Sequence, residues 1–81
     1  MAMPDDAEIA AVLMALARER GPEKTFCPSE AARRLAADWR PLMDDVRRVA
    51  AGLPLEARQA GRQVDAARAA GPIRLRLAGS G

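Results

Sequence analysis

The residue type with the clearest chemical use in this sequence is arginine, whose charged guanidinium binds phosphate or carboxylate oxygens through two parallel hydrogen bonds. Residues 1–40 carry six basic and seven acidic side chains, a net charge of −1, whereas residues 41–81 carry seven basic and four acidic ones, a net charge of +3. The basic residues of the second half are Arg47, Arg48, Arg58, Arg62, Arg68, Arg74 and Arg76. This asymmetry indicates an anionic partner; the alternative is ordinary solvation of exposed arginines.

Catalytic chemistry has little support in the composition. The chain contains no His, no Tyr and one Cys, which excludes triads built on His and zinc sites of His and Cys ligands. The neighbouring acids Asp44 and Asp45 cannot flank one bond, because consecutive residues of a helix point about 100° apart. We therefore expect a protein that is not an enzyme and has no catalytic residue, metal or cofactor.

Two single residues allow a functional and a structural interpretation. Cys27 could be a reactive thiol at a helix N-terminus or a small buried hydrophobe. Trp39 could stack on a nucleic-acid base or fill the corner between helices. The structural role is favoured for both. A lone Cys forms no internal disulfide, and neither a signal segment nor an apolar run of about 20 residues is found, so we expect a reduced, cytoplasmic protein without a membrane partner.

Three helices are predicted in the first two thirds of the chain. Apolar residues recur at helical spacing from Ile9 to Leu16, which predicts a helix over residues 5–20. A second helix begins at Pro28, with Cys27 at the N-cap and Glu30 at the third helical position, as in a capping box. A third begins at Arg40-Pro41 and has an apolar stripe. This stripe consists of Leu42, Val46, Val49, Ala50 and Leu53.

The opposite face of the third helix is the one that a recognition helix would offer to a major groove. It consists of Arg40, Asp44, Arg47, Arg48 and Ala51. Asp44 and Arg48 are four residues apart with the acid first, the favourable order for an ion pair within a helix. Part of the positive charge is therefore expected to be neutralised locally.

Strand patterns follow the helices. Residues 55–58 alternate apolar and polar side chains, as an edge strand with one buried face does. Gly61 permits a turn, and residues 62–72 form a link with a helical turn at 65–70. Residues 73–77 are the cleanest strand, with Arg74 and Arg76 on the face opposite three apolar residues. Residues 25–26 are a candidate short strand beside this hairpin.

The order helix, tight connection, helix, hairpin predicts a winged helix-turn-helix fold, mostly α with a small antiparallel β-wing: a three-helix bundle with a two- or three-stranded hairpin sheet. We expect residues 1–81 to form one domain, with 1–4 and 78–81 frayed. Residues 21–30, 38–43 and 71–77 resemble the small bacterial family catalogued as domain of unknown function 3253. The resemblance implies a compact winged-helix domain. It also implies a shared pattern that includes Trp39, Arg40, Pro41, Arg74 and Arg76.

The leading functional prediction is binding of duplex DNA by the third helix and the basic wing. The predicted contacts are Arg40, Arg47, Arg48, Arg58, Arg62, Arg74 and Arg76. The alternative is a protein-interaction or adaptor module that binds no nucleic acid, and the protein is expected to be a monomer or a homodimer formed through residues 5–20. A continuous arginine surface over the third helix and wing would favour DNA. Arginines paired with acids would favour a protein partner or none.

Overall fold

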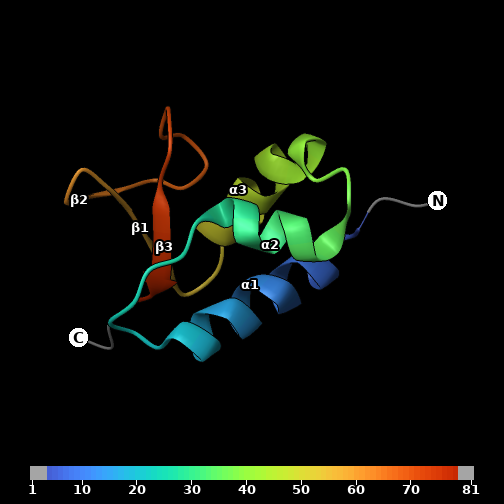
Figure 1. Cartoon of the computed structure of the whole chain (residues 1–81). Coiled ribbons are helices and arrows are strands. Elements are labelled where there is room, and N and C mark those ends of the chain that lie inside the picture. Colours follow the sequence, from blue (N-terminus) through green and yellow to red (C-terminus); the bar gives the residue numbers. More distant parts are fainter. Residues whose placement is uncertain (1–3, 79–81) are drawn as a thin grey trace.

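The structure, a computed structural model, describes residues 4–78 and places three α-helices beside a three-stranded antiparallel sheet (Figure 1). The elements within these residues are α1 (Asp6–Arg20), α2 (Pro28–Leu35), a 3₁₀ turn η1 (Arg40–Leu42), α3 (Met43–Ala51), β1 (Leu55–Gln59), β2 (Arg62–Val64) and β3 (Arg74–Leu77). The sheet stands at one end of the molecule and the connection from α2 to η1 at the other. This arrangement is a small winged-helix-like fold, as predicted.

The boundaries of α1 and α2 follow from local capping chemistry. Asp5 caps α1, because its carboxylate accepts a hydrogen bond of 2.8 Å from the Glu8 backbone N–H. In α2 the predicted capping contact is confirmed: the Glu30 carboxylate accepts a hydrogen bond of 2.9 Å from the Cys27 backbone N–H. Gly21, with a φ of 80°, ends α1 in a conformation that disfavours other residues.

The third helix begins at Arg40-Pro41, as predicted, but its first turn is the 3₁₀ turn η1, and α3 proper starts at Met43. Three residues of its predicted apolar stripe, Leu42, Val46 and Ala50, are buried, and Val49 and Leu53 are half-buried. Trp39 lies just before η1 and is half-buried against the core, so it fills the corner between the helices only in part.

The sheet differs from the prediction in its order. β1 was predicted as an edge strand but lies in the centre, between β2 and β3. The residues of β2 were predicted as part of a link. They form a strand because Ala60 and Gly61, with φ of 51° and 79°, make a two-residue turn whose twist suits a hairpin. The helical turn predicted at residues 65–70 is present as a single turn. In it, the Asp65 carbonyl accepts hydrogen bonds from the N–H groups of Arg68 and Ala69.

The strand prediction for the end of the chain is confirmed. Leu75 is buried and Arg74 is exposed, as alternation requires, and β3 pairs antiparallel with β1. The short segment at Thr25-Phe26 also joins the sheet as predicted, since Phe26 forms an isolated bridge with Leu75 through two backbone hydrogen bonds of 2.8 Å.

One core lies between the helices and the inner face of the sheet. Its largest fully buried side chains are Phe26, Ile9, Leu13, Leu16, Leu42, Leu75 and Val46. Ala31, Ala32 and Ala57 let the elements approach closely. This packing fixes the sheet so that its other face points away from the helices.

Of the ends that were predicted to be frayed, Ala78 donates a backbone hydrogen bond of 3.0 Å to the Pro54 carbonyl. Residues 1–3 and 79–81 lie outside the described residues. Within residues 4–78, none of the helices has the length and apolar character needed to span a bilayer.

Candidate nucleic-acid interface

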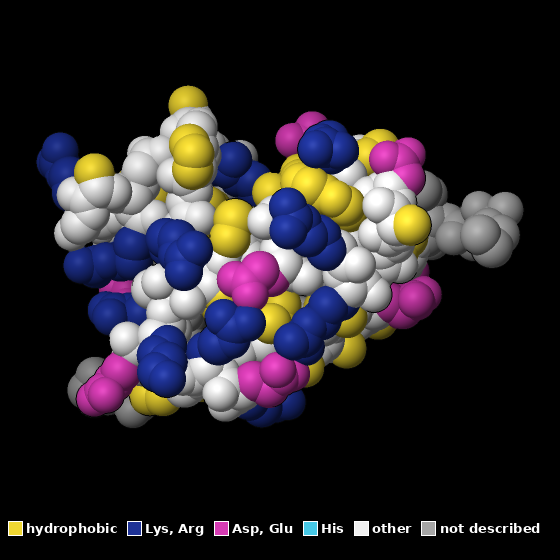
Figure 2. Space-filling view, in the orientation of Figure 1, with side chains coloured by type: hydrophobic (Ala, Val, Ile, Leu, Met, Phe, Trp, Pro, Cys, Tyr) yellow, Lys and Arg dark blue, Asp and Glu magenta, His cyan; other side chains and the backbone are white. Residues whose placement is uncertain are grey.

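The outer face of the sheet gathers three of the predicted arginines. Strand alternation and the pairing register place Glu56, Arg58, Gln63, Arg74 and Arg76 on this face. Glu56 stands opposite Arg76 and Arg58 opposite Arg74 in the antiparallel pair of β1 and β3. We call these five residues the outer sheet face. With three cations and one anion, it has a net charge of +2. Cationic side chains cluster at this end of the molecule (Figure 2).

Glu56 contacts two of the three arginines of the outer sheet face. Its carboxylate accepts a hydrogen bond of 2.6 Å from Arg76 Nε and one of 3.0 Å from an Arg58 terminal nitrogen. The hydrogen bond from Arg76, supported by the charges of both arginines, holds the pKa of Glu56 below its usual range. One carboxylate therefore orients two guanidiniums and cancels the charge of only one.

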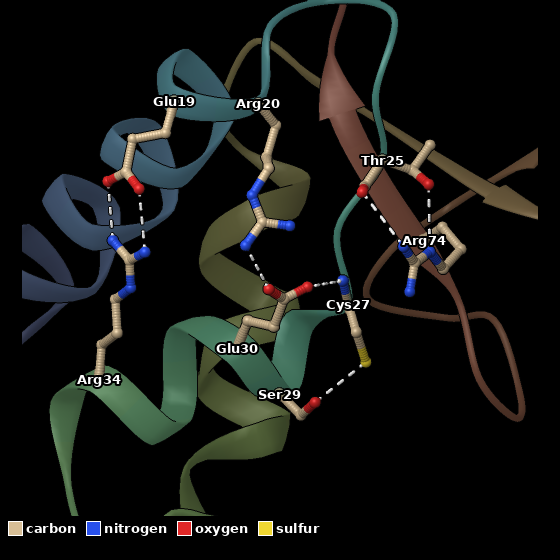
Figure 3. A network of polar contacts seen from close by, with 8 residues as sticks. All are labelled: Glu19, Arg20, Thr25, Cys27, Ser29, Glu30, Arg34 and Arg74. Carbon is tan, nitrogen blue, oxygen red and sulfur yellow. Dashed lines mark hydrogen bonds and ion pairs between the residues drawn. The ribbon is translucent and has the colours of Figure 1, made fainter.

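Arg74 is fixed by neutral partners instead of an acid. Its Nε donates a hydrogen bond of 3.1 Å to Thr25 Oγ1 and a terminal nitrogen donates one of 3.1 Å to the Thr25 carbonyl (Figure 3). The nearby Glu30 does not pair with Arg74, because its carboxylate binds the Cys27 N–H and Arg20. The Cys27 hydrogen bond is the first cause of the lowered pKa of Glu30. Arg74 thus keeps its full charge at the surface.

Arg62 lies at the tip of the β1–β2 hairpin. It pairs with Gln59 in the register, which puts it on the other side of the strand from the outer sheet face, and it is exposed at the turn. No hydrogen bond or ion pair of its side chain occurs within residues 4–78. Exposed Lys24 precedes Thr25, the residue that holds Arg74, and so adds a cation at the opposite edge of the sheet.

Arg47 has a structural position. Predicted on the exposed face of the third helix, it is half-buried, and its guanidinium donates to three backbone carbonyls of the loop between β2 and β3. The acceptors are the carbonyls of Ala66 at 2.9 Å, Gly71 at 3.2 Å, and Ala69. Three of its five N–H donors thereby hold the loop against α3, and the side chain is not presented to a groove.

Arg48 is neutralised on a different side of α3. It forms a bidentate ion pair with Asp6 at 2.8 and 2.9 Å, and a longer contact of 3.3 Å with Asp45. Asp44, which was predicted to form an ion pair with Arg48, does not pair with it. The hydrogen bond from Arg48 lowers the pKa of Asp6, and the two acids raise the pKa of Arg48. This pair joins α3 to the start of α1.

Arg40 lies apart from the sheet. Its guanidinium carbon is 4.9 Å from the centre of the Trp39 ring, and that of Arg33 is 4.7 Å from the same centre. The seven predicted arginines therefore occupy three places: the sheet with its hairpin tip, the contacts of α3 with its neighbours, and the Trp39 corner. They do not form the continuous surface over the third helix and wing that would favour DNA, and a cationic surface remains on the wing alone. Sequence reasoning missed the role of Thr25, whose hydroxyl carries no signal until the Phe26 bridge brings it beside β3.

By fold, the chain is a winged-helix-like domain with a cationic outer sheet face. It belongs to the family described as protein of unknown function (DUF3253), which matches residues 6–78. The matched range contains every helix and strand described above. No curated protein matches the chain.

Proposed function

We propose that this domain binds duplex DNA through the outer sheet face and the adjacent hairpin tip, contacting mainly the phosphate backbone. The observation that carries the proposal is the position of Arg58 directly opposite Arg74 in neighbouring strands. Like charges in this position destabilise a sheet. Glu56 contacts Arg58 and leaves Arg74 without an acidic partner. A phosphate bound between them would offset this repulsion and accept hydrogen bonds from the N–H donors that Glu56, Gly61 and Thr25 leave free.

A duplex fits this surface better than a single strand. Proteins that bind single strands stack bases on exposed aromatic side chains. The outer sheet face contains no aromatic residue, and Phe26, the aromatic residue nearest to it in the sheet, is fully buried. Arginines without aromatic neighbours can bind phosphates but cannot stack bases. Every duplex presents a regular backbone of phosphates to such a surface.

The contacts would position the protein and read little sequence. Reading of base edges in this fold normally falls to the third helix. In α3, Arg47 is bound to carbonyls and Arg48 to carboxylates, while Asp44 is exposed and would repel phosphate. The proposed surface is therefore the wing, and the proposed binding is largely independent of sequence.

Fluorescence anisotropy with a labelled random-sequence duplex of about 30 base pairs tests the proposal. Glu56 cancels one of the four charges of Arg58, Arg62, Arg74 and Arg76. If the remaining three neutralise three phosphates, the logarithm of the binding constant should fall against the logarithm of salt concentration with a slope of about −2.7. The double variant Arg74→Ala/Arg76→Ala should bind more weakly and reduce the magnitude of the slope to about 0.9, because two phosphate contacts are lost.

The matched control is Arg18→Ala/Arg34→Ala, which removes the same net charge from α1 and α2. Arg34 pairs with Glu19 on the helical side, away from Arg74 (Figure 3). This control should keep the slope of the unchanged protein. A salt-independent response, or equal weakening by both double variants, would contradict the proposed surface.

A further inference from the structure

A second cationic cluster lies at the end of the molecule opposite the sheet. It consists of Trp39 and the two arginines whose guanidiniums lie over its ring, Arg33 from α2 and Arg40 from η1. Both arginines are exposed and the indole is half-buried. We call these three residues the Trp39 cluster. Figure 1 shows the connection from α2 to η1 at this end of the molecule, and Figure 2 shows apolar surface between cationic side chains in the same region.

The arginines of the Trp39 cluster differ from three other arginines on the helices. Arg20, Arg34 and Arg48 are each paired with a carboxylate at 2.7 to 2.8 Å. Within residues 4–78, neither Arg33 nor Arg40 forms an ion pair or a hydrogen bond through its guanidinium. Contact with the ring restrains each guanidinium but uses none of its N–H donors. The N–H donors of these two oriented guanidiniums are therefore free to bind an external acceptor.

The surroundings favour a carboxylate of a protein over a phosphate of a nucleic acid. Asp38 and Asp44 are exposed within four residues of Arg40 and would repel any anion. They would repel a duplex, with one charge per about 1.7 Å of its axis, more strongly than a peptide, whose residues are about 3.3–3.6 Å apart. Exposed apolar residues, Ala37 and Pro41, flank Trp39 in the sequence. Trp and Arg are the residue types that contribute most to binding at protein interfaces, where an aromatic ring is covered and a charge is paired.

We propose that the Trp39 cluster is a docking site for an acidic protein segment that carries an apolar side chain. Its carboxylates would accept hydrogen bonds from Arg33 and Arg40, and its apolar side chain would cover the exposed part of the indole. The site is separate from the outer sheet face, so the inference does not rest on DNA binding. With both surfaces the domain would join a protein to a duplex.

Trp39 is the one tryptophan of the chain, so its intrinsic fluorescence reports directly on this site. The probe is a synthetic peptide of Glu-Glu-Leu repeats, titrated while the emission of Trp39 is recorded. A saturable change is expected, and Arg33→Gln/Arg40→Gln should weaken binding about tenfold or more. The uncharged peptide of Gln-Gln-Leu repeats should give no saturable change.

Two comparisons make the result specific. The charge-matched variant Arg18→Gln/Arg34→Gln should bind the acidic peptide within about twofold of the unchanged protein. Arg33→Gln/Arg40→Gln should leave the anisotropy of the labelled duplex unchanged. The proposal is overturned if both double variants lose the peptide equally, if the emission never saturates, or if the duplex itself alters Trp39 emission and displaces the peptide. The last result would assign the cluster to nucleic acid.

Discussion

Replacement of Arg47 by Met removes the guanidinium that joins α3 to the loop between β2 and β3 and keeps most of the apolar stem. Three backbone carbonyls, those of Ala66, Ala69 and Gly71, lose their donor. Since the bonds to Ala66 and Ala69 are partly buried, water cannot replace them fully. We expect the loop to detach from α3 and the free energy of unfolding to fall.

The size of the loss follows from the geometry. A hydrogen bond from a charged donor contributes about 1.5–3 kcal/mol, but bonds from one side chain act together and do not add. Because the Gly71 bond is exposed, we expect a total loss of about 2–3 kcal/mol for Arg47→Met. In a domain of this size, 1 kcal/mol shifts the melting temperature by about 4–8 °C, so a fall of roughly 10–20 °C is expected.

Urea and thermal unfolding, followed by far-ultraviolet circular dichroism, measure this loss. The matched control is Arg68→Met, which changes an exposed arginine of the same loop whose side chain makes no hydrogen bond within residues 4–78. The control should stay within about 0.5 kcal/mol of the unchanged protein. If Arg47→Met is equally harmless, the three hydrogen bonds contribute no stability, and Arg47 does not hold the loop against α3.

Two further predictions concern the caps and turns of the same fold. Glu30 has a lowered pKa in the folded state, so its contribution is present at neutral pH and is lost as the pH falls through that value. Glu30→Gln should therefore lower the free energy of unfolding by about 1 kcal/mol at pH 7, and the difference should shrink as the pH falls below 4.5, the usual pKa of the Glu carboxyl, in urea titrations. Ala60 holds a φ of 51° in the hairpin turn. Ala60→Asn should raise the free energy of unfolding by about 0.5–1 kcal/mol, because Asn-Gly is the preferred pair for this turn. A fall in the melting temperature of Ala60→Asn would show that the turn has a different conformation.

The helices were predictable because their signals are local. Pro28 and Glu30 mark the start of α2 within three positions, and the apolar spacing of Ile9 to Leu16 marks the buried face of α1. The alternation in β3 likewise fixed which face carries Arg74. Each of these patterns depends on neighbours within one turn or one strand.

The sheet order was not predictable by the same reasoning. The hairpin of β1 and β2 turns at Ala60-Gly61, and Ala gives no sign of a positive φ. Without that turn, residues 62–64 resemble a link, and β1 then has one partner instead of two. The prediction of an edge strand failed for this reason.

The arginines show the same division between local and distant determinants. The common face of Arg58, Arg74 and Arg76 follows from alternation once the two strands are paired. The positions of Arg47 and Arg48 depend on partners up to 42 residues away, the loop carbonyls and Asp6, which the helical pattern of α3 cannot reveal. The face of the third helix that periodicity predicts as exposed therefore includes Arg47 and Arg48, whose side chains already bind partners within the folded protein.

The most direct test of the proposed interface is a titration of the protein with duplex DNA, followed by nuclear magnetic resonance of the arginine Nε–H groups. Binding by the outer sheet face predicts that the signals of Arg58, Arg74 and Arg76 shift, while those of Arg47 and Arg48 stay in place. Shifts confined to Arg47 and Arg48 would contradict the account, because DNA would then have to replace the carbonyl and carboxylate partners seen at α3.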